Sequence, residues 1–221
     1  AVAAVLLAVF IGWERRVAHP MLDVRLFRNM RFSAASGAVT VAFFTLFGFI
    51  FLITQFFQFV KGYGPLSTGV HLLPVALSVG IGSVAGTQLA VRVGTKLVVT
   101  VGLVAMAAFY GWVAATTAAT LGYGVIAVQM VLYGLGMGLT SAPATESIMG
   151  AVSRRQAGVG SAVNDSTRLL GGTLGATIAG TSFEAIKNIP NLYKKTFSAE
   201  TPDLNAKVAE LNKTKSELDQ A

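Results

Sequence analysis

The longest uncharged stretch of the chain is residues 97–145, LVVTVGLVAMAAFYGWVAATTAATLGYGVIAVQMVLYGLGMGLTSAPAT. A single α-helix of that length would extend about 74 Å, more than twice the roughly 30 Å of a bilayer's hydrocarbon core. The stretch therefore predicts two membrane-spanning helices joined by one turn. We expect the turn at a cluster of small and polar residues, Thr116, Thr117, Thr120, Gly122 and Gly124.

Further stretches on both sides of this segment predict more spans of the same kind. Residues 32–60 and 62–91 contain no Asp, Glu, Lys or Arg, and a last apolar segment, 158–183, contains only two charged residues. The predicted fold is all-α, a polytopic membrane protein with five full helices. We place these spans at 33–60, 67–91, 97–117, 122–150 and 158–183.

The composition supports a membrane protein over a soluble helical bundle. Charged residues make up 12% of the chain, about half of what an ordinary soluble domain carries. Amphipathic soluble helices would show a charged stripe, which these segments lack. The chain has no Cys, which excludes a disulfide framework and a thiolate metal site.

Basic residues alternate between the connections. Three connections expected on one side of the membrane hold Arg15, Arg16, Arg25, Arg28 and Arg31, then Arg92 and Lys96, then Arg154 and Arg155. The opposite connections hold only Lys61. Because short cytoplasmic loops are enriched in Lys and Arg, the first set is predicted to be cytoplasmic. This distribution explains the net charge of +7 by membrane topology, so no nucleic-acid partner is predicted.

The two ends of the chain differ from the middle. Residues 1–13 are apolar but too few to span a bilayer, and we interpret them as the end of a transmembrane helix. Residues 14–32 then form a cytoplasmic loop, and 33–183 a five-helix transmembrane domain. Residues 184–221 contain six Lys and six acidic residues, and we interpret them as a polar tail or loop that is external by parity.

Ionisable residues inside predicted spans are the first candidates for function, because each is costly in a membrane. Glu146, Asp165 and Arg168 qualify, and Asn164 is a polar neighbour. Asp165 and Arg168 are three residues apart on one helix, so they can pair. The cluster is either a cytoplasmic salt-bridge latch, or a site where Glu146 or Asp165 exchanges a coupling proton, or a set of side chains that reach the interface without a role.

Small residues at intervals of four predict close helix packing, which membrane helices need because lipid gives no hydrophobic drive for their association. Pro143 on the same helix as Gly134 and Gly138 indicates either a helix that can bend, as alternating access would require, or tight packing alone. The candidates for packing or bending are Gly134, Gly138, Pro143, Gly171 and Gly175.

Enzyme chemistry is not predicted. The chain contains neither a zinc-ligand spacing nor a phosphate-binding loop nor a nucleophile elbow. No cofactor or metal is predicted, and without a nucleotide site any transport would be driven by an ion gradient or by diffusion.

Four segments together resemble one known family, the fourteen-helix drug:proton antiporters of the major facilitator superfamily (EmrB/QacA type). They are HPMLDVRLFRNMRFS (19–33), QFFQFVKGYGPLSTGVHLLPVALSVGIGSVAGTQLAVRVGTK (55–96), PATESIMG (143–150) and AGVGSAVNDSTRLLGGTLG (157–175). The resemblance implies that the chain is a fragment of the C-terminal half. The N-terminal half and the last helix of the transporter would then lie outside it.

The resemblance also implies a function: proton-coupled multidrug efflux by alternating access in a bacterial plasma membrane, with a small apolar or cationic molecule as cargo. Arg92, Gly94 and Lys96 are similar to the second copy of a cytoplasmic gating motif, although Val91 stands where the motif has an acid. Two alternatives stay open. One is an exporter of a siderophore, lipid or metabolite on the same fold, and the other is a membrane scaffold that does not transport.

Overall fold

The computed structural model describes residues 9, 12, 13, 16, 24–116, 122–153 and 156–200, with the backbone alone at 24, 25 and 185–200. The chain divides into two units, residues 1–177 and 178–221. Most of the predicted helix end at 1–13 and of the loop up to residue 23 lies outside the described residues. So do Arg15, Arg154, Arg155 and the tail beyond residue 200.

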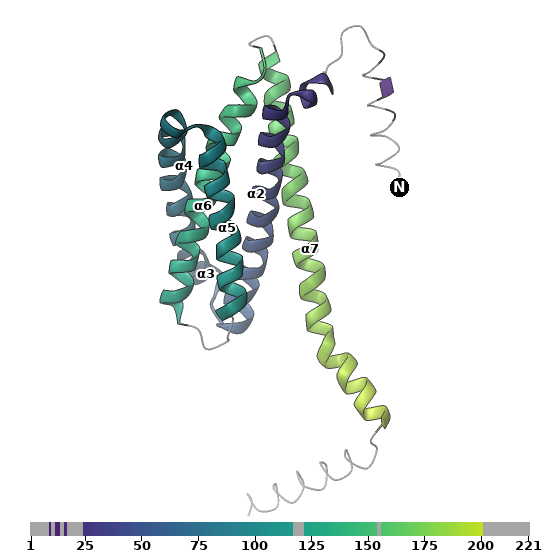
Figure 1. Cartoon of the computed structure of the whole chain (residues 1–221). Helices are drawn as coiled ribbons and strands as arrows, with labels where there is room; N and C mark the ends of the chain where they lie inside the picture. The colour runs from purple at the N-terminus through teal and green to yellow at the C-terminus, as the bar shows by residue number, and fades with distance from the viewer. Residues whose placement is uncertain are drawn as a thin grey trace, which may run out of the picture. The chain divides into compact units, whose positions relative to one another are not determined.

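All regular structure within the described ranges is helical, as predicted (Figure 1). The elements are the 3-10 turn η1 (Val24–Arg28), α2 (Met30–Gln55), the π-helical turn η2 (Phe56–Val60), α3 (Pro65–His71), α4 (Leu73–Val93), α5 (Thr95–Thr116), α6 (Tyr123–Gly150) and α7 (Ala157–Glu200). Residues 157–177 of α7 belong to the first unit, and the rest of α7 belongs to the second.

Four of the five predicted spans are confirmed as helices that are long and apolar enough to cross a membrane. They are Met30–Val60, Pro65–Val93, Thr95–Thr116 and Tyr123–Gly150. The fifth, 158–183, lies within α7, which does not meet the same criterion among the described residues. Asp165 and Arg168 lower the hydropathy of α7, so a transmembrane position for this segment stays a prediction.

The predicted turn inside the long uncharged stretch is present. α5 ends at Thr116, and α6 begins at Tyr123 after Gly122. The stretch therefore forms two antiparallel helices, which pack against each other. α2 begins where Asn29 accepts a hydrogen bond from the backbone N–H of Arg31 at Oδ1, at 3.0 Å, as a helix N-cap.

The predicted span 67–91 is interrupted, which the sequence analysis did not foresee. α3 ends at His71 and α4 begins at Leu73, with Pro74 in its first turn. Proline has no backbone N–H, so it cannot continue the hydrogen bonding of the preceding helix. The backbone N–H of Leu72 is shared between the carbonyls of Thr68, at 3.1 Å, and Gly69, at 3.2 Å.

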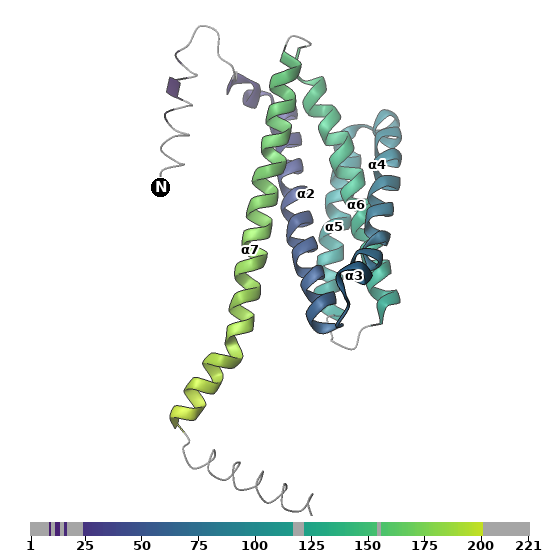
Figure 2. The ribbon, with the colours of Figure 1, turned by 180° about the vertical axis from the view of Figure 1, so that it is seen from behind.

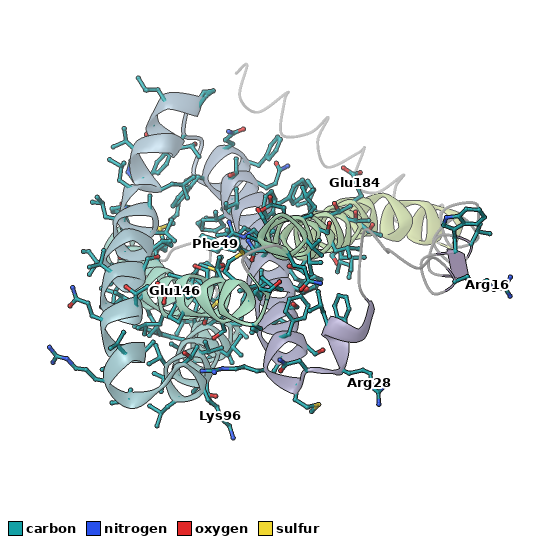
Figure 3. The ribbon with its side chains drawn as sticks, turned by 90° about the horizontal axis from the view of Figure 1, so that it is seen from above. Arg16, Arg28, Phe49, Lys96, Glu146 and Glu184 are labelled. Carbon is teal, nitrogen blue, oxygen red and sulfur yellow. The ribbon has the colours of Figure 1, made fainter. Side chains whose placement is uncertain are left out.

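The connections predicted to be cytoplasmic lie at one end of the helices. Figure 1 shows η1, the α4–α5 turn, the end of α6 and the start of α7 together at the top. The α2–α3 connection, the end of α5 and the start of α6 lie at the opposite end. Figure 3 views the bundle from the first end, where Arg28 and Lys96 are labelled. This arrangement is what the alternation of basic residues requires. Which end faces the cytoplasm stays a prediction.

Two seams of glycine hold the first unit together. α4 packs along α6 (Figures 1 and 2), and a Cβ on Gly82 would lie 2.7 Å from the main-chain oxygen of Leu135. A Cβ on Gly134 would lie 2.7 Å from the main-chain oxygen of Val75. On the other side α2 runs beside residues 157–177 of α7. There a Cβ on Gly171 or Gly175 would overlap the main-chain oxygens of Thr40 and Phe44. Both seams bring backbone against backbone.

Candidate functional site

A chain of hydrogen bonds joins α6 to α7. Arg168 on α7 donates from Nη2 to Oγ1 of Thr145 on α6, at 3.0 Å. The same Oγ1 lies 3.3 Å from Oδ1 of Asn164, one turn before Arg168. Asn164 is buried, and the neighbouring Val163 and Ala144 belong to an apolar core cluster. The structure thus builds one polar network beside an apolar core.

The rest of the Arg168 guanidinium group has neutral surroundings. Its Cζ lies 4.9 Å from the ring centroid of Phe43 on α2, a cation–π contact. Its Nε is buried and has no hydrogen-bond partner among the residues that the structure describes. α2 carries no charged residue between positions 32 and 55 and so offers no anion. In the part of the chain that the structure describes, Arg168 is held by neutral groups.

Thr145 is a site residue that the sequence analysis missed. Its Oγ1 also lies 2.8 Å from the main-chain oxygen of Ser141. A hydroxyl has one proton, so it donates either to Ser141 or to Asn164 while it accepts from Arg168. A threonine in an uncharged span ordinarily bonds to its own helix, so its type and position carry no signal. Only the partners from α7 distinguish it.

The two predicted acids lie at the edge of this network. The side chains of Glu146 and Asp165 are exposed, and the described structure contains no ion pair between either of them and Arg168. Asp165 directly follows the buried Asn164, and one residue along a helix turns the side chain by about 100°. The structure therefore brings Asn164 and Arg168 together and leaves the carboxylates outside. The proton-coupling role of the acids stays a prediction.

Glu146 instead lines a polar cavity of about 370 Å³ at the end of the bundle where the basic connections gather (Figure 3). α2 and α5 both begin at this cavity, and their N-termini favour a negative charge nearby. Arg31 adds a positive charge to the same wall. The other lining residues are Asn29, Thr95, Ser147, Gly150 and Ala151.

The predicted gating residues form the turn between α4 and α5. Gly94 has φ +93°, a backbone conformation that side chains with a Cβ rarely adopt. Arg92 and Lys96 flank it with exposed side chains, and Figure 3 shows Lys96 at the periphery of the bundle. A sharp turn therefore presents two cations at the predicted cytoplasmic end.

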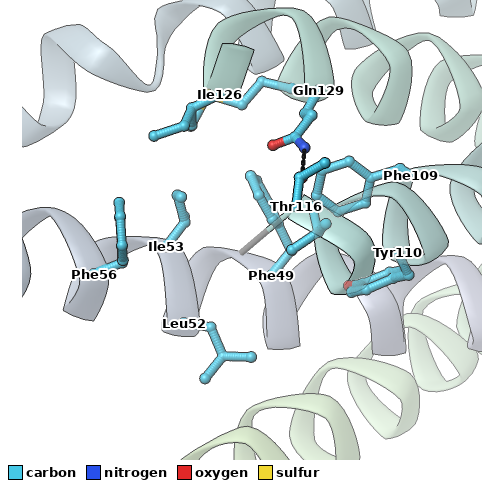
Figure 4. Close-up of a pocket in the computed structure, with 11 residues that line it drawn as sticks. Phe49, Leu52, Ile53, Phe56, Phe109, Tyr110, Thr116, Ile126 and Gln129 are labelled. Carbon is cyan, nitrogen blue, oxygen red and sulfur yellow. Dashed lines mark hydrogen bonds between the residues drawn. The ribbon is translucent and has the colours of Figure 1, made fainter. Parts of the chain in front are cut away.

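A second cavity, of about 180 Å³, lies between α2, α5 and α6 in their opposite halves (Figure 4). Its lining is apolar and aromatic, with Phe49, Phe109 and Tyr110 among its walls. Gln129 is the buried polar member and donates from Nε2 to Oγ1 of Thr116, at 2.9 Å. The sequence carries no signal for this cavity, since its walls come from helices distant in sequence.

The described residues contain no group of three or more His, Cys, Asp or Glu side chains that could hold a metal ion.

Comparison with known proteins gives a consistent result. Residues 1–176 match the Major Facilitator Superfamily. The chain is 32% identical over 183 residues to the Multidrug resistance protein Stp of Mycobacterium tuberculosis. The matched stretch covers 83% of this chain and 34% of Stp. It is 32% identical to the Multidrug efflux pump LfrA of Mycolicibacterium smegmatis, over 80% of the chain and 35% of LfrA.

A third relative is the Methyl viologen resistance protein SmvA of Salmonella typhimurium. It is 34% identical over 193 residues, covering 85% of the chain and 38% of SmvA. The chain thus spans little more than a third of the length of these relatives.

Proposed function

Because this chain belongs to the Major Facilitator Superfamily, we propose that it is the C-terminal-half part of a proton-coupled exporter of small molecules that works by alternating access. The observation that carries the proposal is its similarity, over about four fifths of the chain, to proteins named for multidrug resistance and efflux. The four membrane-length helices of the described structure support an integral membrane protein.

We propose a small apolar or cationic molecule as the cargo. The support comes from the relatives, one of which is named for resistance to methyl viologen. The further partners are the lipid bilayer, protons and an N-terminal half of the same transporter. The expected location is the bacterial plasma membrane.

The glycine seams support movement of packed helices. Alternating access in transporters is largely a rocking of one bundle against another. The α4–α6 and α2–α7 contacts are backbone on backbone, so each pair can move as a rigid body. In this proposal Arg92, Gly94 and Lys96 act at the inner gate.

Proton coupling is assigned to the acids beside the network. Glu146 shares a cavity with Arg31, and Asp165 lies next to the network formed by Arg168, Thr145 and Asn164. A membrane carboxylate whose surroundings change between two conformations can load and unload a proton.

The test is export of methyl viologen from everted vesicles that contain the complete transporter, driven by an imposed proton gradient. Glu146→Gln and Asp165→Asn together are expected to abolish gradient-driven export and to leave the protein in the membrane. Glu184→Gln, at the start of the polar segment, is the matched control and should export normally. Full activity of the double variant would remove both acids from the mechanism.

A further inference from the structure

Arg168 has fewer partners than its surroundings require. A guanidinium group has five N–H donors. Among the described residues, that of Arg168 makes one hydrogen bond, to Thr145, and one aromatic contact, to Phe43. Its Nε is buried without a partner. A charged side chain at membrane depth is usually paired with an opposite charge. The state described here therefore leaves Arg168 able to bind an anion.

The carboxylate best placed to be that anion is Asp165. It precedes Arg168 by three residues on α7, and side chains three apart are neighbours on a helix surface. α2 has no charged residue that faces Arg168. On α6 the candidate is Glu146, which lines the cavity of Arg31. Asp165 is exposed and has no ion pair with Arg168 in this state.

Thr145 can release Arg168 without being left unpaired. Its hydroxyl accepts from Arg168 in the described structure, and its single proton has an acceptor on its own helix, the main-chain oxygen of Ser141, at 2.8 Å. A buried donor without a partner would be costly. Because the Ser141 bond remains after Arg168 leaves, the hydrogen bond between Arg168 and Thr145 can break without leaving the hydroxyl of Thr145 unpaired.

We propose that Arg168 exchanges partners during transport and that Thr145 is the positioning residue that holds it while Asp165 is protonated. This assignment rests on the proposed proton-coupled function. When Asp165 loses its proton to water, the carboxylate accepts the N–H groups of Arg168. The hydrogen bond from Arg168 to Thr145 breaks, and α7 loses one of its polar contacts with α6. Protonation of Asp165 reverses the exchange.

The first experiment measures gradient-driven export of methyl viologen by the complete transporter carrying Thr145→Val or Thr145→Ser. The valine variant keeps the shape and loses the hydroxyl, so we expect export to fall about tenfold, the effect of losing one hydrogen bond to a charged group. The serine variant should rescue export. Thr140→Val removes a hydroxyl whose hydrogen bond in the described structure is to Gly136 of its own helix, and it should export normally.

The second experiment does not depend on transport. It compares the thermal stability of the detergent-purified wild type, Thr145→Val, Asp165→Asn and the double variant in acid and in alkaline buffer. In alkaline buffer the ionised Asp165 already holds Arg168 in the wild-type background. Thr145→Val should therefore cost more stability when Asp165→Asn is also present than when it is absent. In acid buffer it should cost the same in both backgrounds.

The exchange is supported if the stability effects of Thr145→Val and Asp165→Asn are non-additive in alkaline buffer and become additive in acid buffer. The structure shows no hydrogen bond between Thr145 and Asp165, so a direct contact would not explain the coupling. Additivity at both pH values, or a serine variant as impaired as the valine variant, would overturn it. If the wild type exports nothing on a proton gradient, the proposed function fails. The stability cycle still decides whether Arg168 exchanges partners.

Discussion

Tyr133 on α6 donates a hydrogen bond from its hydroxyl to Oγ1 of Thr45 on α2, at 3.2 Å. Tyr110 on α5 donates to the main-chain oxygen of the same Thr45, at 2.8 Å. Three helices therefore meet at one threonine. The rings of Phe49 and Phe109 pack against Tyr133, with centroids 4.8 and 4.9 Å away.

Removing the buried hydroxyl should weaken this junction while keeping its packing. Tyr133→Phe leaves the ring in place and removes the bond to Thr45, so we expect a loss of about 1 kcal/mol in the free energy of unfolding. Thermal unfolding of the detergent-purified protein is the measurement. Tyr63→Phe, which keeps the ring contacts of Tyr63 with Phe57 and His71, is the comparison. Equal stability of wild type and Tyr133→Phe would show that the bond adds nothing.

The α4–α6 seam provides a matched pair of glycines on one helix. A Cβ on Gly82 would lie 2.7 Å from the main-chain oxygen of Leu135, whereas a Cβ on Gly80 would meet nothing within 4 Å. Gly82→Ala should push the helices apart and reduce the yield of monodisperse protein in size-exclusion chromatography. Gly80→Ala should elute as the wild type does, since alanine favours a helix. Identical elution profiles of Gly82→Ala and the wild type would contradict the close packing of α4 against α6.

The turn before α5 should depend on the absence of a side chain at Gly94. Its φ of +93° strains any residue with a Cβ, at a cost of about 1–3 kcal/mol. There is open space around it, so a clash does not contribute. Gly94→Ala should therefore lower the melting temperature through the backbone alone. Gly37→Ala, which also has open space but lies within α2, should not lower it.

Topology can be tested directly because the chain contains no Cys. Met30, Leu66 and Val91 have highly exposed side chains. In a cysteine-free background, Met30→Cys and Val91→Cys should react with a membrane-impermeant maleimide from the cytoplasmic side, in inverted vesicles. Leu66→Cys should react from the outside, in intact cells. Labelling of Met30→Cys and Val91→Cys from opposite sides would contradict the predicted orientation.

The spans could be predicted because the membrane acts on every residue of a long segment at once. An uncharged run such as 97–145 has few alternatives, and α5 and α6 end within a few residues of the predicted limits. The interruption of the helix at Leu72 could not be predicted from hydropathy, because the residues around it are as apolar as those of the span. Pro74 is the sequence feature that indicates it. Backbone hydrogen bonding decided that position.

The candidate site was predicted less well because it depends on side-chain direction. Sequence spacing shows that Asp165 and Arg168 can meet, but it does not show that Thr145 and Phe43 compete for Arg168. The polar cavity was missed for a similar reason. Its Arg31 and Glu146 are more than a hundred residues apart, and only the packing of the helix ends places them on one wall.

Where Gly171 and Gly175 meet the backbone of α2, no acyl chain can enter between the helices. The lipid composition of the host membrane should therefore not affect these contacts. A change from a thin, fluid bilayer to a thick, ordered one alters the lipids that contact the outside of the bundle. The α2–α7 glycine seam should stay intact. Production in a foreign organism should consequently depend on the exposed apolar side chains of the helices, such as Leu77 on α4 and Val104 on α5, and not on this seam.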